Sequence, residues 1–550
     1  MNIVVIGAVA GGTSAAAKAR RNSESAVITM FDKDTDISYS ACGLPYYIAE
    51  EIQERKELTP RDSAFFQKRY NIQVKTGHEV LEIDSQSKQL KVKALASQEV
   101  FTHNYDKLVI STGATSKTLS IPGADLENVF TLRNVSSADQ IKEYLTSGQP
   151  KKATVIGSGF IGLEVADALF SRGLEVTVVE AMNHLLPPFD DDMAIYLEKY
   201  LLQKGISLVL GETAKEFLGT KKVEKVLLNS GREIATDLVV VAIGVQPNTE
   251  LARKAGIQLG ETGAIKVNKK METNIPDIYA VGDCAESYSL LTGEPLYRPM
   301  GTTANKMGRI AGDNLTGGSL EFRGILGTGI FKIGEYTAAV TGLSEQEALK
   351  NGYQVETIHN VKPNQQTYYP GGSEMVIKAV ADRKSKKLLG TQIFGKHGVD
   401  KRIDVFATAI SFGATVEDLF HLDLAYSPPY ATTKDPIAYT GMILTNDILG
   451  GRPLISPREL VEEKAQGEDL LIIDVRDPKQ YEKSHVDDAI NIPLDQLREK
   501  LHQLDQEKNI VVYCNGGVSG NSAQNTLINY GFKKVRNLSG GHKNWEVWKK

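Results

Sequence analysis

Thiols are the side chains with the greatest chemical reactivity in this 550-residue sequence, which holds three cysteines, Cys42, Cys284 and Cys514. They lie far apart, and three are too few for a disulfide framework, so the pattern is typical of a reducing compartment where each thiol stays free. A free thiolate can form a mixed disulfide, a persulfide or a sulfenic acid. The elements around each cysteine must therefore decide which of them does chemistry.

A glycine-rich turn begins the chain. Residues 2–6 are a short apolar run typical of a buried parallel strand, and they lead through Gly7, Gly11 and Gly12 into an alanine-rich segment. Such a turn lets a pyrophosphate approach the N-terminus of a helix. A second apolar run ends at Asp32, where an acid about 20 residues after the glycines can accept the ribose hydroxyls. The segment predicts a dinucleotide site.

The same plan recurs in residues 153–180, with a full GxGxxG at Gly157, Gly159 and Gly162 and an acid, Glu180, at the end of the second strand. An acid at this place accepts both ribose hydroxyls of NADH and repels the extra phosphate of NADPH, so NADH is favoured and NADPH is the alternative. Two dinucleotide sites in one chain imply electron transfer between two cofactors, and the usual pair is FAD with a nicotinamide.

A third motif, IYAVGDCAE at residues 278–286, places Gly282 and Asp283 directly after a buried strand. The carboxylate of Asp283 can hydrogen-bond a cofactor's sugar-like chain there, and the alternative is a cap on the next helix. Together with GAVAGG, the STGA segment that holds Thr112 and Gly113, and GSGFIG, this order of motifs resembles the two-dinucleotide flavoprotein disulfide reductases. The resemblance implies FAD at the first motif and the GD motif, and NAD(P)H at the central one.

Members of that family that resemble glutathione reductase carry two cysteines spaced CxxxxC. This chain has Cys42 alone, with Tyr47 five residues later, so no internal disulfide can form. The resemblance makes Cys42 the catalytic thiol beside FAD rather than a buried inert cysteine. Cys284 directly follows Asp283 in a tight turn, and we expect it to be a small packed residue.

Among single-cysteine members, the segment SACGLPYYI around Cys42 resembles the coenzyme A disulfide or persulfide reductases more than the NADH oxidases and peroxidases. In that group two tyrosines, matching Tyr368 and Tyr426, reach the reactive cysteine across a dimer interface, where a phenol can donate a proton to a leaving thiolate. The resemblance therefore implies a homodimer. It covers essentially residues 1–445 and extends through YYPGG at 368–372, GKHGVDKRIDV at 395–405 and LAYSPPYATTKD at 424–435.

The resemblance also implies a coenzyme A site. The positions that match the group's CoA contacts are Ser14, Arg21, Ser38 and Lys434. Arg21 and Lys434 carry the charge to pair with the phosphates of the ADP moiety. The match is incomplete, because relatives have Asn where this chain has Ala41, and other polar or basic residues at the positions of Lys18, Tyr70 and Asn305.

The last part of the chain begins with Ser456 and Glu459, spaced as a helix capping box. The segments 470–494 and 510–523 resemble a single rhodanese domain, in which Cys514 ends a buried strand and enters a loop before a helix. Backbone N–H groups of such a loop can stabilise a thiolate or persulfide, and the chain is expected to curl outward there.

Active rhodaneses often show CxxGxR, but this loop has Ser519 where the arginine would stand. A dianionic thiosulfate then loses a bidentate partner. The sequence therefore predicts weak thiosulfate:cyanide activity, with persulfide handling on Cys514 still open.

The expected fold class is α/β, with two Rossmann-like dinucleotide-binding domains, an α+β dimerisation domain and a C-terminal α/β rhodanese domain. This fits the length, since domains average about 150 residues. The expected boundaries are 1–149 and 246–325 for the two parts of the FAD-binding domain, 150–245 for the NAD(P)H-binding domain, 326–445 for the dimerisation domain, 446–455 for a linker and 456–550 for the rhodanese-like domain.

The composition indicates which classes of partner the protein can bind. The net charge is −5 without a basic block, which argues against nucleic acid. The sequence shows no apolar run of about 18 residues and no basic segment before the first apolar run, so neither a membrane span nor an export signal is expected. We expect a cytoplasmic enzyme acting on small molecules, with no metal ligands.

The expected reaction passes electrons from NADH through FAD to an oxidised form of Cys42, which then reduces CoA disulfide, CoA persulfide or polysulfide. The fused rhodanese domain favours the sulfane-sulfur substrates, because a tethered carrier raises the local concentration of a persulfide. The alternatives are an NADH oxidase or peroxidase that cycles a sulfenic acid on Cys42, and a non-enzymatic redox sensor or sulfur carrier.

Overall fold

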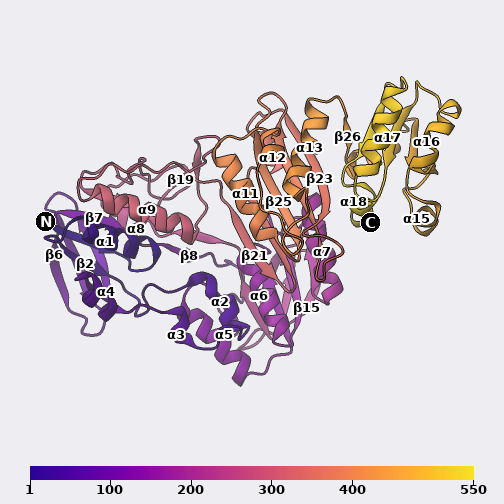
Figure 1. Ribbon diagram of the computed structural model, residues 1–550. Helices are drawn as coiled ribbons and strands as arrows, with labels where there is room; N and C mark the ends of the chain where they lie inside the picture. Colours follow the sequence, from indigo (N-terminus) through magenta and orange to yellow (C-terminus); the bar gives the residue numbers. More distant parts are fainter. Residues whose placement is uncertain (550) are drawn as a thin grey trace. The chain divides into compact units, whose positions relative to one another are not determined.

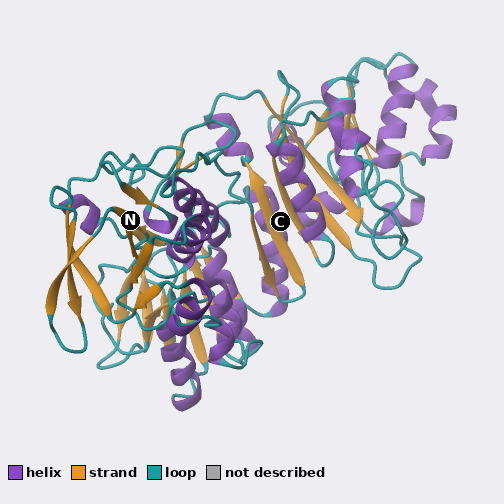
Figure 2. Ribbon diagram, turned by 60° about the vertical axis from the view of Figure 1, so that its left-hand side comes forward, coloured by secondary structure: helices purple, strands orange, loops and turns teal. Residues whose placement is uncertain are grey.

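The computed structural model describes residues 1–549. The chain forms two compact units, one made of Met1–Ala181 and Gly205–Ile325, and the other of Met182–Lys204 and Leu326–Lys550. Helices flank the sheets in both units (Figure 2).

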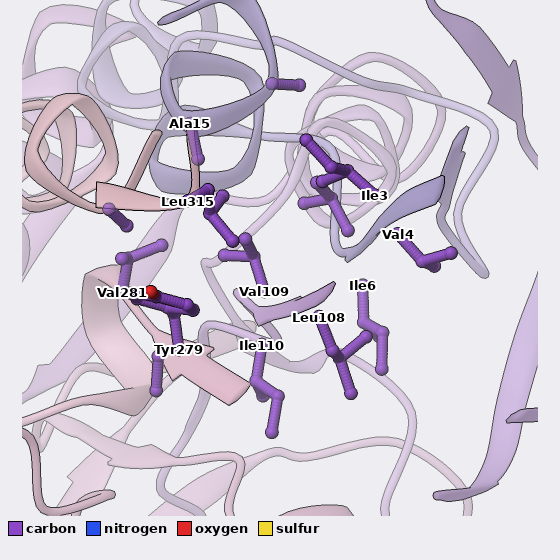
Figure 3. Packing of buried hydrophobic residues seen from close by; sticks show 14 of the residues in the cluster. Ile3, Val4, Ile6, Ala15, Leu108, Val109, Ile110, Tyr279, Val281 and Leu315 are labelled. Atoms are coloured by element: carbon purple, nitrogen blue, oxygen red, sulfur yellow. The ribbon is translucent and has the colours of Figure 1, made fainter. Parts of the chain in front are cut away.

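The first large sheet of the first unit is parallel and has the strand order β18-β7-β1-β2-β3. Its central strands are almost entirely apolar, because helices cover both faces of a parallel sheet. Figure 3 shows Ile3, Leu108 and Tyr279 of three neighbouring strands packed in one buried cluster. The strands are β1 (Asn2–Ile6), β2 (Val27–Phe31), β3 (Gln73–Lys75), β7 (Lys107–Ile110) and β18 (Ile278–Ala280).

Two helices belong to this sheet, α1 (Ala10–Asn22) and α9 (Gly301–Asn314), and they lie side by side although nearly 300 residues separate them (Figure 1). Small residues allow the close packing. A Cβ added at Gly308 would lie 2.2 Å from the carbonyl oxygen of Gly11. The segment that carries α9 thus returns to the first helix of the chain.

The second large sheet of this unit is also parallel, with the order β12-β11-β10-β16-β9. It repeats the strand–turn–helix plan of the first, with α6 (Phe160–Ser171) directly after β10. The strands are β9 (Val129–Thr131), β10 (Lys152–Ile156), β11 (Glu175–Glu180), β12 (Ser207–Leu210) and β16 (Leu238–Val241).

Smaller elements complete the first unit. The antiparallel strands are β4 (His78–Asp84), β5 (Gln89–Ala94) and β6 (Val100–Asn104), β13 (Ala214–Leu218), β14 (Lys225–Leu228) and β15 (Glu233–Ala235), β8 (Ala114–Ser116) with β17 (Val245–Pro247), and β19 (Ser287–Tyr288) with β20 (Pro295–Leu296). The remaining helices are η1 (Ala41–Gly43), α2 (Leu44–Ile48), α3 (Arg55–Leu58), α4 (Ser63–Tyr70), α5 (Val135–Ser147), α8 (Glu250–Lys254) and η2 (Gly282–Cys284).

The second unit contains an antiparallel sheet of order β21-β22-β25-β24-β23, so β23 is an edge strand. Helix α7 (Asp191–Lys204) packs on β25 and on α18. The strands are β21 (Gly329–Ile333), β22 (Tyr336–Gly342), β23 (Val355–Pro363), β24 (Glu374–Asp382) and β25 (Leu388–Gly395), and the helices are α10 (Glu345–Lys350), α11 (Val399–Ser411), α12 (Asp418–His421) and α13 (Pro436–Ile448).

The same unit holds a parallel sheet of order β26-β30-β29-β27-β28. The predicted capping box is confirmed, since Ser456 and Glu459 exchange side-chain and backbone hydrogen bonds at the start of α14. The strands are β26 (Leu454–Ile455), β27 (Leu470–Asp474), β28 (Ile490–Asn491), β29 (Asn509–Tyr513) and β30 (Val535–Leu538), and the helices are α14 (Pro457–Ala465), α15 (Pro478–Lys483), α16 (Leu494–Lys500), η3 (Leu501–Gln503), α17 (Val518–Asn529) and α18 (Gly541–Trp548).

The predicted fold class is confirmed. One local difference concerns the linker expected at 446–455, because its first residues continue α13 and its last two form β26. The reason is that Asp447 is buried and paired with Arg383, which holds the helix onto the antiparallel sheet. Among residues 1–549, no helix combines the length and apolar composition that crossing a membrane requires.

Candidate active site

At the first glycine turn, between β1 and α1, backbone atoms lie so close to Gly7 and Gly12 that no side chain would fit. Gly7 has a φ of +99°, and a Cβ there would lie 2.0 Å from the carbonyl oxygen of Ser111. A Cβ at Gly12 would lie 1.9 Å from the carbonyl oxygen of Gly7. These two glycines therefore bring α1 onto β1 and β7, while the N-terminus of α1 faces away from the sheet core.

The central GxGxxG turn separates two roles of glycine. A Cβ at Gly162 would lie 2.1 Å from the carbonyl oxygen of Gly157, whereas a Cβ at Gly159 would meet no atom within 4 Å. Gly157 and Gly162 thus serve helix–strand packing, and the space beside Gly159 is open at the N-terminus of α6. This is the cradle that a pyrophosphate requires, and the residues present fit a dinucleotide.

The two acids predicted to bind ribose occupy equivalent positions. Asp32 accepts a hydrogen bond from the backbone N–H of Ala8 at 2.7 Å, and Glu180 accepts one from the N–H of Ser158 at 2.8 Å. In each case the donor directly follows the first glycine of the turn. Burial raises the pKa of Asp32 above its ordinary value. Each acid therefore ties its glycine turn to the end of the second strand.

The GD motif lies against a residue that the sequence analysis missed. Arg133 donates a hydrogen bond to the carboxylate of Asp283 at 2.7 Å and another to the carbonyl oxygen of Ala114 at 2.9 Å. Asp283 thus pairs with a cation instead of capping a helix. No sequence motif surrounds Arg133, so only the fold could reveal this pair. Cys284 is fully buried, as expected for a packed residue.

The STGA segment is fixed by a neighbouring loop. Thr112 donates a hydrogen bond to the carbonyl oxygen of Asn248 at 2.7 Å, and Asn248 N–H donates one to the carbonyl oxygen of Gly113 at 2.9 Å. Gly113 has a φ of +68°, which favours glycine. The segment therefore has a rigid backbone beside the GD motif.

Cys42 lies in the short turn η1, just before α2, and its side chain is exposed. The protein around the thiol removes part of its hydration and thereby raises its pKa, and the carboxylates of Glu164 and Asp283 raise it further. The guanidinium of Arg133 acts in the opposite direction and lowers it. The charge state of Cys42 therefore depends on three groups brought in from distant segments.

Glu164 is a second residue that the sequence analysis missed. It lies two residues after Gly162 on α6, and Tyr46 donates a hydrogen bond to it at 3.0 Å. Burial raises the pKa of Glu164 to about 7. A carboxyl group with this pKa can hold or release a proton near neutral pH beside Cys42. In the sequence, only its position just after the central glycines could have marked Glu164 as a candidate site residue.

A cavity of about 490 Å³ in the first unit is lined by three arginines, Arg21, Arg61 and Arg309. It reaches Ser38 and Ser40, and Ser40 lies two residues before Cys42. Three guanidinium groups around one cavity suit a ligand with several phosphates. Because the cavity reaches Ser40, a ligand bound in it would lie next to the segment that carries Cys42.

Three of the four residues predicted to contact CoA, Ser14, Arg21 and Ser38, line this cavity. Lys434 is exposed and belongs to the second unit. Arg61 and Arg309 were not predicted, because their neighbours form no motif.

Two positions that depart from the group's pattern, Tyr70 and Asn305, also line the cavity. Ser14 donates a hydrogen bond to Asn305 at 2.5 Å. Lys18 instead pairs with Asp313 at 3.0 Å.

The two predicted tyrosines lie in the second unit. Tyr368 and Tyr426 are exposed, and their mutual hydrogen bond raises the pKa of Tyr368. Gln366 also donates to the hydroxyl of Tyr426 at 3.2 Å. The two phenols therefore form one polar cluster on the surface of this unit.

Cys514 follows β29 and precedes α17, as predicted, and the N–H of Gly517 donates a hydrogen bond to its Sγ at 3.2 Å. The expectation that the chain curls outward is wrong, because Cys514 is only 6% exposed. Strand β23 covers the loop, since a Cβ at Gly516 would lie 3.3 Å from the carbonyl oxygen of Val361.

Comparisons with known families account for most of the chain. Residues 1–304 match the pyridine nucleotide-disulphide oxidoreductase model, residues 330–436 match the dimerisation domain of the same family, and residues 456–547 match the rhodanese-like domain. A Pyrococcus furiosus protein named NAD(P)H sulfur oxidoreductase (CoA-dependent) is 36% identical over 446 residues, which are 80% of this chain and 98% of that protein.

Two solved structures resemble nearly the whole chain. Reduced Bacillus anthracis CoADR-RHD has a TM-score of 0.96 and 38% identity, covering 99% of this chain and 98% of that one. An NAD-dependent persulfide reductase from A. fulgidus has a TM-score of 0.93 and 39% identity, covering 99% of this chain and 100% of that one. Since one family model spans more than half of the sequence, the chain belongs to the pyridine nucleotide-disulphide oxidoreductase family, extended by a rhodanese-like domain.

Proposed function

We propose that this chain is a FAD-dependent reductase that uses NADH to reduce CoA disulfide, CoA persulfide or polysulfide through Cys42, with sulfane sulfur handled on Cys514. The observation that carries the proposal is the cavity with three arginines that reaches Ser40, beside Cys42. It suits a phosphate-bearing thiol bound next to a lone cysteine. The Pyrococcus furiosus relative is named as CoA-dependent, and the A. fulgidus structure as a persulfide reductase.

The cofactor sites follow from the two cradles. FAD would be held at Gly7, Gly11 and Gly12, with Asp32 on its ribose, and by the STGA and GD segments through Thr112, Gly113, Gly282 and Asp283. NADH would be held at Gly157, Gly159 and Gly162, with Glu180 on its ribose. When bound, FAD supplies a two-electron relay from the nicotinamide to the sulfur on Cys42. Glu180 favours NADH over NADPH, because a carboxylate repels the 2′-phosphate.

The protein's own part of the reaction is thiol–disulfide exchange at Cys42. The Cys42 thiolate attacks CoA disulfide, a bond forms between its Sγ and one CoA sulfur, and the other CoA leaves as a thiolate. With CoA persulfide or polysulfide, Cys42 takes the sulfane sulfur, which is then released as sulfide after reduction. Arg133 favours the attacking thiolate, and Glu164 opposes it when ionised.

CoA would be held by Ser14, Arg21 and Ser38, with Arg61 and Arg309 adding positive charge for its phosphates. Lys434 and the tyrosine cluster of Tyr368 and Tyr426 would act from the second subunit of a homodimer. A phenol there can donate a proton to the leaving thiolate.

The mass of the purified holoenzyme under non-reducing conditions tests this proposal. An adduct of CoA mass on the peptide that contains Cys42 is expected, whereas one added oxygen would instead indicate an NADH oxidase or peroxidase. In turnover, Cys42→Ser is expected to abolish NADH oxidation driven by CoA disulfide or polysulfide. The matched control Cys284→Ser changes a thiol that lies in the core and is expected to retain turnover, while full activity of Cys42→Ser would refute the proposal.

A further inference from the structure

The loop after Cys514 carries no charge of its own. The sequence from Cys514 to Ala523 is CNGGVSGNSA, which contains neither an acid nor a base. An anionic sulfur substrate, or a persulfide formed on Cys514, therefore finds no cation within the loop. The nearby rhodanese residue Arg476 is neutralised by Asp474, which accepts hydrogen bonds from Nε at 3.0 Å and from Nη2 at 2.6 Å.

A lysine from the antiparallel sheet of the same unit enters this loop. Lys362 lies near the end of the edge strand β23, and its Nζ donates a hydrogen bond to the carbonyl oxygen of Gly516 at 3.0 Å. Only 9% of the side chain is exposed. Its ammonium also lies 4.7 Å from the ring centroid of Tyr439 on α13. The cation is thus fixed from two sides within the shielded loop of Cys514.

No acid neutralises this ammonium: among residues 1–549, no carboxylate pairs with Lys362. Burial lowers the pKa of Lys362, and so does the charge of Lys543, whereas the negative charges of the Cys514 thiolate and of Glu374 raise it. The other charged or titratable groups that face the loop are Lys543 and His542 on α18 and Glu374 on β24. Lys543 forms an ion pair with Glu374, and burial lowers the pKa of His542, which favours its neutral form. Lys362 is therefore the cation that remains for an anion at Cys514.

The loop and the strand are held together by further contacts. The N–H of His359 on β23 donates a hydrogen bond to Ser539 Oγ at 2.7 Å, and the N–H of His542 donates one to the carbonyl oxygen of Cys514 at 2.8 Å. Because α18 packs on β23, the rhodanese loop is presented to Lys362 in a fixed position.

We propose that Lys362 of the dimerisation domain completes the rhodanese site by supplying the cation that is missing because Ser519 stands where the arginine would be, and that the site takes the outer sulfur of persulfides, R–S–SH. This deepens the proposed function and rests on sulfane-sulfur handling at Cys514. In the step, the Cys514 thiolate attacks the outer sulfur of R–S–SH. The bond between Cys514 Sγ and the outer sulfur forms, the S–S bond of R–S–SH breaks with its electron pair on the inner sulfur, and the proton of the outer sulfur moves to that inner sulfur. The products are R–SH and a Cys514 persulfide anion, which Lys362 pairs with.

The experiment measures how charge at position 362 affects two reagents of similar size. In the full-length holoenzyme, Cys514 is alkylated by anionic iodoacetate or by neutral iodoacetamide, and the two rates are followed on the Cys514 peptide by mass spectrometry. Lys362→Met is expected to lower the iodoacetate-to-iodoacetamide ratio by about 5-fold, because one unit charge near the thiolate is lost. Lys362→Arg keeps the charge and is expected to keep the ratio.

Two further variants sharpen the test. Lys543→Met combined with Glu374→Gln removes the neighbouring ion pair without changing the net charge, and it should leave the ratio unchanged. Ser519→Arg in the Lys362→Met background is expected to restore the ratio by returning a cation to the loop. The rate of sulfur transfer from glutathione persulfide to Cys514 should rank the variants in the same order as the alkylation ratio does.

An unchanged ratio in Lys362→Met would overturn the proposal. If Lys362 only held the loop in place, its loss would change the alkylation rates with iodoacetate and iodoacetamide by the same factor. NADH oxidation with CoA disulfide reports on Cys42 and separates the two proposals. If the native enzyme shows no NADH oxidation with CoA disulfide while the alkylation ratio drops in Lys362→Met, only the proposed function is refuted. If NADH oxidation is normal while the alkylation ratio stays the same in Lys362→Met, only the role of Lys362 is refuted.

Discussion

The guanidinium of Arg133 lies 2.7 Å from the carboxylate of Asp283, a residue 150 positions later in the chain. The pair joins the segment before α5 to the GD motif. Both groups also act on Cys42, since Arg133 lowers the pKa of that thiol and Asp283 raises it. The electrostatic environment of the Cys42 thiol therefore depends on this ion pair as well as on the thiol's immediate neighbours.

Replacing Arg133 is expected to make Cys42 less reactive. In Arg133→Met the cation that favours the thiolate is lost, so alkylation of Cys42 by iodoacetamide at pH 7 should slow by about 3-fold or more. The rate is measured on the Cys42 peptide after reduction and desalting. Arg133→Lys keeps the charge and is the control. An equal rate in Arg133→Met and the native protein would contradict the assigned role.

Replacing Glu164 is expected to have the opposite effect. The ionised carboxylate opposes the Cys42 thiolate, so Glu164→Gln should speed alkylation of Cys42. Because the pKa of Glu164 is about 7, the gap between variant and native protein should be small at pH 6 and grow as the pH rises through 7. Tyr46→Phe removes a hydrogen bond that lowers the pKa of Glu164, and it should move this rise to higher pH. A gap that does not change with pH would rule out titration of Glu164 as the cause.

The cavity arginines are expected to govern binding of CoA substrates. Arg61→Met should raise KM for CoA disulfide about 10-fold with little change in kcat, because a phosphate contact far from the reacting sulfur is lost. Lys18→Met is the control, since Lys18 pairs with Asp313 outside the cavity lining. KM should also rise with ionic strength in the native enzyme. Equal KM values for the two variants would argue against the cavity as the CoA site.

A buried ion network is expected to hold the second unit together. Lys378 is fully buried and lies 2.8 Å from Asp192 and 2.6 Å from Glu345. Burial alone would raise the pKa of Asp192, but Lys378 more than offsets this and lowers it well below its usual range. Lys378→Met removes the ammonium from between these carboxylates, with His359 still 3.2 Å from Asp192, and it should destabilise folding by about 3–5 kcal/mol, seen as a lower Tm. Lys384→Met, at an exposed position of the same domain, is the control.

The pH dependence of this loss has a definite sign. In the native protein, the stabilisation from Asp192 is present above the pKa of an unfolded aspartate, about 4, and is lost as the pH falls below it. In Lys378→Met the carboxyl groups that have lost the ammonium have raised pKa values and gain protons as the pH falls from 8 to 5. The difference in Tm between the two proteins should therefore narrow over that range. A difference that widens toward pH 5 would contradict the assigned charges.

The sequence by itself determined the local features. Both glycine turns, the acids Asp32 and Glu180, the capping box at Ser456 and the position of Cys514 after a strand were all readable from spacing. This is because a strand, a tight turn and a helix N-terminus are fixed by residues close in sequence. The fold class followed from the same patterns, and the incomplete rhodanese motif at Ser519 was visible as a departure.

Only the tertiary structure decided which distant charges meet. Arg133 beside Cys42, Arg61 and Arg309 of the cavity, and Lys362 at the Cys514 loop come from segments with no motif of their own, and the motif before Glu164 does not reveal that this residue acts on Cys42. Their energies depend on burial and on the distance between side chains, which the packing of sheets and helices sets and which linear spacing does not encode. For the same reason Cys514, expected in an outward loop, lies shielded under β23.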